Sequence, residues 1–71
     1  MEIYMQNLRE LREDRDKTQQ KITDILGISQ TMYARYELGA NELPIRHLII
    51  LCKYYEVSSD AVLGLAPERR N

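Results

Sequence analysis

The feature that most constrains the fold is a pair of short segments, each opened by a hydroxyl residue and closed by a glycine. Thr18 and Ser29 are typical N-cap residues, whose side-chain oxygens accept hydrogen bonds from the first backbone N–H groups of a helix. Gly27 and Gly39 stand where the segments end, because glycine readily adopts the left-handed conformation of a helix C-terminus. The spacing predicts two short helices joined by a tight turn, over residues 19–26 and 30–38.

The second predicted helix carries different residue types on its two sides. At about 100° per residue, one side holds the side chains expected to pack, with tyrosine hydroxyls reaching the surface: Met32, Tyr33 and Tyr36. The other side holds those expected to face outward: Gln30, Thr31, Ala34, Arg35 and Leu38. Two short helices joined by a glycine-containing turn form a helix-turn-helix, whose second helix fits the major groove of DNA. Gln can form paired hydrogen bonds with adenine edges and Arg with guanine, and a Thr methyl or hydroxyl can meet either thymine or a polar edge, so the outward side is a candidate base-reading surface.

Further helical segments flank this pair. Apolar residues recur at helical spacing over 5–16, Pro44 opens a segment over 45–55, and a break at 57–60 precedes one short turn. The segment over 45–55 is expected to face the core with Ile45, Leu48, Leu51, Cys52 and Tyr55. The pattern as a whole predicts an all-α domain of five short helices.

Composition excludes several classes of protein. With 71 residues there is room for one small domain. No apolar run approaches the roughly 18–20 residues of a membrane span, and the N-terminus lacks the apolar region of a signal peptide, so we expect a cytoplasmic protein with no membrane partner. One cysteine and one histidine are too few for a structural zinc site, and no metal or other cofactor is expected. The net charge of −1 neither indicates nor excludes nucleic acid.

The stretch TQQKITDILGISQTMYARYELG resembles the helix-turn-helix of the Cro/phage-repressor (XRE-like) family. The shared features are a cap followed by Gln, an aliphatic pair before Gly, an apolar residue and Ser, and a helix that ends in Glu-x-Gly. The resemblance extends over residues 6–65 and implies a compact, lambda-repressor-like fold with the motif formed by helices 2 and 3. It also implies a sequence-specific regulator of transcription, most often a repressor. Residues 1–5 would be an N-terminal arm and residues 66–71 a flexible C-terminal tail.

The same resemblance assigns roles to individual residues. Gln30, Thr31 and Arg35 would contact bases, with Met32 and Ala34 at the margin. Gln19 would bind a backbone phosphate, as the exposed N–H groups of a helix N-terminus also favour, and Asn41 would lie near the sugar-phosphate backbone. The residues with a structural role would be the Arg12–Glu37 pair, which ties the first helix to the third, and the two helix-ending glycines, Gly27 and Gly39.

Three positions depart from the family pattern. Thr23 stands where relatives usually have Ala, so its hydroxyl must find a backbone carbonyl. Leu38 replaces a residue that is often polar or basic, and the turn after Gly39 lacks the Lys or Arg common there. With Arg35 as the only cation of the recognition region, we expect a DNA affinity that depends less on salt than that of a basic relative.

Two residues invite a catalytic interpretation. Cys52 could be a nucleophile, but His47 lies five residues away, about 140° around the same helix, so the two cannot pair within it. Cys52 is expected to be a small buried residue instead. No set of carboxylates accompanies a metal site or a phosphate-binding glycine loop, and we expect no enzyme activity.

One surface is a candidate for self-association. The residues His47, Ile50 and Tyr54 are expected on the outer side of the helix over 45–55, with Leu65 nearby. A homodimer would place two recognition helices about 34 Å apart on a palindromic operator. An alternative is a protein-interaction module of the same fold, an antitoxin or adaptor with weak or no DNA binding, which the acidic pI of about 5.7 keeps open.

Overall fold

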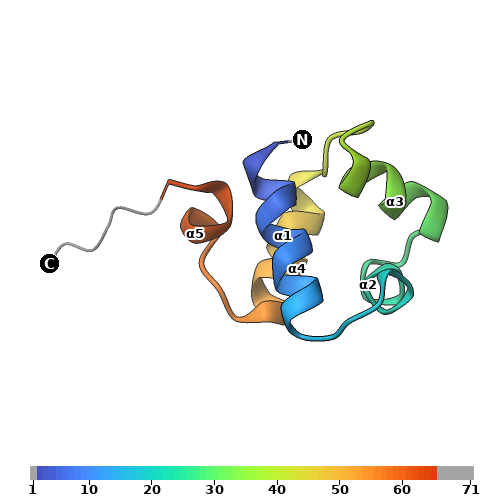
Figure 1. Cartoon of the computed structure of the whole chain (residues 1–71), viewed down its shortest axis with the longest axis horizontal. Coiled ribbons are helices and arrows are strands. Elements are labelled where there is room, and N and C mark those ends of the chain that lie inside the picture. The colour runs from blue at the N-terminus through green and yellow to red at the C-terminus, as the bar shows by residue number, and fades with distance from the viewer. Residues whose placement is uncertain (1, 66–71) are drawn as a thin grey trace, which may run out of the picture.

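The computed structural model describes residues 2–65, and it confirms the expected five-helix, all-α architecture. No strand occurs within that range. The helices are α1 (Ile3–Asp14), α2 (Gln19–Leu26), α3 (Gln30–Leu38), α4 (Ile45–Tyr55) and α5 (Ser59–Leu63). Figure 1 shows α2 and α3 at one end of the molecule and α5 at the other, with α1 and α4 between them. The two helices of the predicted motif therefore form one end of the domain.

Local cap chemistry fixes the ends of α2 and α3 at the predicted residues. The side-chain oxygen of Thr18 accepts a hydrogen bond from the N–H of Lys21, and that of Ser29 accepts one from the N–H of Met32, each at 3.1 Å. Gly27 and Gly39 end the helices at φ angles of 71° and 82°. A side chain at either glycine would be strained at such an angle, whatever space surrounds it.

One core joins all five helices and contains no Phe or Trp. Its buried apolar residues are Met5, Leu8, Ile22, Leu26, Tyr33, Tyr36, Leu43, Leu51, Cys52, Tyr55 and Val62. Thr23 is also buried, and its hydroxyl donates to the carbonyl oxygen of Gln20 at 2.7 Å, as expected for a hydroxyl at that position. Every helix contributes to this core, and α3 does so through Tyr33 and Tyr36. Helix α3 is therefore packed firmly against the rest of the domain.

Residues 3–5, expected to belong to an N-terminal arm over residues 1–5, are helical instead, because α1 begins at Ile3. Met5 is 1% exposed and lies one helical turn before Leu8, which is fully buried. Met5 and Leu8 therefore enter the core from the same face of α1, which includes Met5 in the helix. Residues 66–71, predicted to form a tail, lie outside the described residues.

Two residues of α4 lie on the side opposite to the one expected. His47, predicted to be outside, is 5% exposed, whereas Ile45, predicted to be in the core, is 73% exposed. The cause is the position of α3, which places the Tyr36 ring 6.1 Å from the His47 ring. His47 therefore belongs to the interior and not to a docking surface. Ile50 remains partly exposed and Tyr54 is half-buried.

The described helices hold no candidate membrane span, because none is both long and apolar enough to cross a bilayer. Within residues 2–65 no three His, Cys, Asp or Glu side chains gather in a way that could hold a metal ion.

Candidate nucleic-acid interface

The two sides of α3 are separated as predicted. Tyr33 is fully buried and Tyr36 nearly so, and their rings meet edge to face with centroids 6.4 Å apart. Tyr33 differs from the prediction in one respect: its hydroxyl is buried and has no hydrogen-bond partner among the described residues. Met32 and Ala34 are half-buried at the margin. The exposed residues of α3 are Gln30, Thr31, Arg35 and Leu38.

The Arg35 side chain is oriented by Asn41. Its Nε donates to the Asn41 side-chain oxygen at 3.0 Å. This contact forms because the chain folds back after Gly39, where the N–H of Ala40 donates to the Arg35 carbonyl oxygen at 2.9 Å. The bond uses Nε and leaves the terminal nitrogens of the guanidinium able to donate to another acceptor. Asn41 thus lies beside the candidate reader, with its own side chain exposed.

The pair expected from the resemblance, Arg12 with Glu37, is present and nearly buried. Arg12 Nε donates to Glu37 Oε2 at 2.8 Å, and Arg12 Nη2 donates to Oε1 at 3.2 Å. A third donor, Nη1, binds the carbonyl oxygen of Lys17 at 2.9 Å. The guanidinium therefore ties α1 to α3 and to the turn before α2, in the bidentate geometry that favours arginine–carboxylate pairs.

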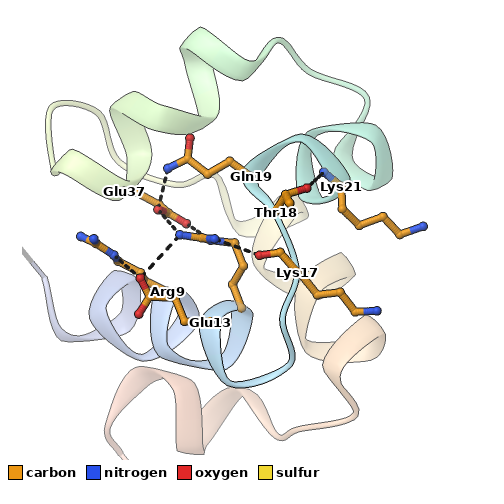
Figure 2. A network of polar contacts seen from close by, with 8 residues as sticks. Arg9, Glu13, Lys17, Thr18, Gln19, Lys21 and Glu37 are labelled. Carbon is orange, nitrogen blue, oxygen red and sulfur yellow. Dashed lines mark hydrogen bonds and ion pairs between the residues drawn. The ribbon is translucent and has the colours of Figure 1, made fainter.

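Gln19 joins this network, a contact that sequence analysis did not predict. Its Nε2 donates to Glu37 Oε1 at 2.9 Å (Figure 2). Figure 2 also shows the Thr18 cap at the start of the same helix. An amide nitrogen carries two N–H groups, so Gln19 keeps one donor for an anion after binding Glu37. No sequence pattern identifies the contact, because Gln19 and Glu37 are eighteen residues apart and meet only when α2 packs on α3.

The electrostatics of this network keep Glu37 ionised. Burial acts to raise the pKa of the Glu37 carboxyl, but the hydrogen bond and positive charge of Arg12, with a further hydrogen bond from Gln19, outweigh it and lower the pKa. The hydrogen bond with Glu37 and the charge of its carboxylate in turn raise the pKa of the Arg12 guanidinium. The ion pair is consequently present at neutral pH.

Cys52 is buried as predicted, at 8% exposed, and burial raises the pKa of its thiol. The two ring nitrogens of His47 are buried without a hydrogen-bond partner among residues 2–65, so His47 does not activate Cys52. A thiol held in its neutral form is a poor nucleophile.

Helices α2 and α3 are both short and are joined by the turn Gly27-Ile28-Ser29, and α3 is anchored by its buried tyrosines. This is the helix-turn-helix arrangement of DNA-binding domains. The chain belongs to the helix-turn-helix family of the Cro/phage-repressor (XRE) type, whose model matches residues 8–62.

Two similar proteins are helix-turn-helix regulators of transcription. Over 66 residues, 93% of this chain, it is 35% identical to YobD of Bacillus subtilis, an uncharacterized HTH-type transcriptional regulator. It is 36% identical over 61 residues, or 86% of its length, to a second such regulator from that organism, YqaE. It covers 59% and 53% of those relatives, so it spans little more than half of their length.

The chain is also similar to a protein of known structure and to an antitoxin. The crystal structure of a transcriptional regulator from Listeria innocua matches 96% of this chain and 64% of that protein, with a TM-score of 0.81 and 26% identity. The chain is also 33% identical over 58 residues to the antitoxin PezA of Streptococcus pneumoniae, covering 82% of this chain and 37% of PezA.

Proposed function

We propose that the protein is a sequence-specific, double-stranded DNA-binding regulator of transcription that reads the major groove with α3. The observation that carries this proposal is the sorting of α3: its tyrosines and Glu37 are buried, while Gln30, Thr31 and Arg35 are exposed together. Membership of the helix-turn-helix family and similarity to HTH-type transcriptional regulators support it.

The exposed side chains match the chemistry of base edges. Arg35 would donate two hydrogen bonds to guanine, and Gln30 would pair with adenine. Thr31 and the exposed Leu38 would contact thymine methyl groups. Met32 and Ala34 would touch the edges of the site. Gln19 would donate its remaining N–H to a phosphate, next to the positive end of the α2 dipole, and Asn41 would contact the sugar-phosphate backbone.

Regulation would follow from occupancy of the operator. Bound at a promoter, the domain would exclude the transcription machinery and act as a repressor in the cytoplasm. A homodimer would bind a palindromic operator, because two-fold symmetry in the protein is matched by two-fold symmetry in the site.

A second function, that of an antitoxin or adaptor that binds another protein, is supported by the similarity to PezA. Such a protein would bind its partner through surfaces other than the outer side of α3. Replacing Arg35 should therefore weaken the DNA-binding function and leave the adaptor function unchanged.

The test is a selection of preferred sequences from random duplexes near physiological salt, followed by binding measurements with Arg35→Ala. The proposal expects an enriched sequence and a loss of affinity of about 5- to 150-fold, equivalent to about 1–3 kcal/mol, with the fold intact. Arg9→Ala, which removes an exposed cation from α1, is the matched control for charge. Failure to enrich any sequence, or equal effects of the two variants, would favour the adaptor.

A further inference from the structure

A groove of about 240 Å³ lies between α1 and α5, and most of the side chains that line it are apolar. The apolar lining consists of Leu11, Val57, Ala61 and Val62. Leu11 and Val57 are half-buried and Ala61 is exposed, so this apolar surface is open to solvent. An apolar cavity of about 150 Å³ already holds a molecule of the size of benzene, so the groove has room for one large aliphatic side chain. We call these four residues, together with Asn7, Glu10 and Asp14 of the same lining, the α1–α5 groove.

Two carboxylates, those of Glu10 and Asp14, lie on the α1 side of the groove. They are four residues apart, so they stand about 6 Å apart, one turn along the same face of the helix. Both side chains are exposed, and neither forms an ion pair within residues 2–65. The edge of the groove therefore carries two negative charges that the described part of the chain does not neutralise.

The arginines nearest to these carboxylates in the sequence are engaged elsewhere. Arg9 and Arg12 form ion pairs with other carboxylates of the chain. Arg15 Nη1 donates to the carbonyl oxygen of Tyr55 at 2.6 Å, and the guanidinium lies 5.4 Å from the centre of the Tyr55 ring. Positive charge that complements the groove therefore has to come from a partner.

Asn7 links the two helices that form the groove. Its Nδ2 donates to the carbonyl oxygen of Val62 at 2.8 Å, which ties α1 to α5. The groove is thus formed before any partner arrives, and a preformed site loses less conformational entropy on binding.

We infer that the α1–α5 groove binds a basic segment of another protein, in which one aliphatic side chain is flanked by lysines or arginines. The aliphatic side chain enters the groove, and the flanking cations pair with Glu10 and Asp14. The same two carboxylates repel nucleic acids and anionic membranes, so the charge favours a protein partner.

The inference goes beyond the proposed function and does not depend on it. Figure 1 shows α5 at the opposite end of the domain from α2 and α3. A segment bound in the α1–α5 groove therefore leaves the outer side of α3 free, and the domain can hold DNA and the partner at the same time.

The experiment measures binding of a fluorescein-labelled synthetic peptide to the full chain by fluorescence anisotropy, without DNA. The peptide has a central leucine, two lysines on each side of it and alanines elsewhere. The double variant Glu10→Lys/Asp14→Lys should bind it about tenfold more weakly or worse, because both charge pairs become repulsive. The matched control is Asp24→Lys/Glu42→Lys, the same change of net charge at two exposed carboxylates outside the groove. It should change the affinity by less than about threefold, because charges far from the peptide are screened by salt.

A second pair of measurements tests the apolar contact. Ala61→Leu fills the groove from the α5 side and should weaken binding by about tenfold. A peptide with serine in place of the central leucine should lose a similar factor, and one with glutamates in place of the lysines should not bind. Circular dichroism melts of each variant show whether the fold is retained.

Three outcomes would overturn the inference: no binding of the lysine peptide, equal effects of the two double variants, or equal binding of the leucine and serine peptides. Arg69 and Arg70, outside the described residues, are a rival source of cations within the chain. A gain in peptide affinity on replacing both by alanine would assign the groove to them and would also overturn the inference.

The proposed DNA function is tested separately by the selection of duplexes, so either result can fail without the other.

Discussion

The guanidinium of Arg12 and the carboxylate of Glu37 form a bidentate pair between α1 and the last turn of α3, with Glu37 only 3% exposed. Two further polar groups, the Lys17 carbonyl and the Gln19 amide, complete the coordination. The Arg12–Glu37 pair thus holds α3, the helix proposed to read DNA, from its buried side. It involves none of the exposed side chains of α3.

Glu37→Ala should remove most of the stability of this small domain. It removes the bidentate partner of the nearly buried Arg12 guanidinium and leaves only the exposed Glu13 carboxylate, 3.8 Å from Arg12 Nη2, so the cost should approach the roughly 3–5 kcal/mol of a broken buried pair. Urea unfolding at neutral pH measures the loss. Arg9→Ala breaks the exposed Arg9–Glu13 pair and should cost no more than about 1 kcal/mol. Similar effects of the two variants would contradict a structural role for Glu37.

Asn41→Ala should weaken operator binding by about three- to tenfold without changing the unfolding midpoint, because it removes the hydrogen bond to Arg35 and the proposed contact with the DNA backbone. A double-mutant cycle with Arg35→Ala separates the two causes. If Asn41 acts by orienting Arg35, its effect shrinks in the Arg35→Ala background. An undiminished effect would leave only the contact of Asn41 with DNA.

Stability should fall as the pH drops below about 6.5. Burial, reinforced by the positive charge of Arg46, lowers the pKa of His47 from its ordinary value of 6.5. Below that value the unfolded chain binds more protons than the folded one, so the free energy of unfolding decreases by at most about 1.4 kcal/mol per pH unit from this residue. The Tyr36 ring from α3 packs against the imidazole and offers it no carboxylate.

Urea midpoints at pH 7.5 and 5.5 measure this dependence, and His47→Phe should remove it. Glu37 also makes stability depend on pH, but at a lower pH than His47 does. Because the pKa of Glu37 is below its ordinary value of 4.5, its stabilisation is complete above that value and is lost as the pH falls through the folded-state pKa. Equal pH dependence in the His47→Phe variant would assign the effect to another group.

Operator affinity should depend only weakly on salt. Arg35 is the only cation on α3, and a protomer that neutralises about two or three phosphates gives a slope of log affinity against log salt of roughly −2 to −3. Fluorescence titrations at several salt concentrations measure the slope. A much steeper slope would mean that cations outside α3, such as Lys17 and Lys21, contact the backbone.

The sequence predicted where helices begin and end better than it predicted which side of each helix is buried. The bounds of α2, α3 and α4 were predicted correctly because caps, glycines and Pro44 act on their immediate neighbours. Helix α1 was placed two residues too late, since nothing before Ile3 resembles a side-chain cap, and α5 proved longer than the single turn expected.

The errors on α4 have a different cause. Helical spacing gives the angle between Ile45 and His47 but not which side meets the rest of the protein, and that side is decided by α3 and its Tyr36. The buried and exposed sides of α3 were easier to predict because they differ sharply in residue type. The link from Gln19 to Glu37 could not be predicted, since it depends on how two helices pack.

The division of α3 into a buried and an exposed side has a consequence for evolution. Tyr33, Tyr36 and Glu37 hold the helix in place, and none of them is offered to a ligand. Substitutions at Gln30, Thr31 and Arg35 can therefore redirect the domain to a different target without requiring compensating changes in its interior. Related chains can diverge in what they recognise while sharing one scaffold.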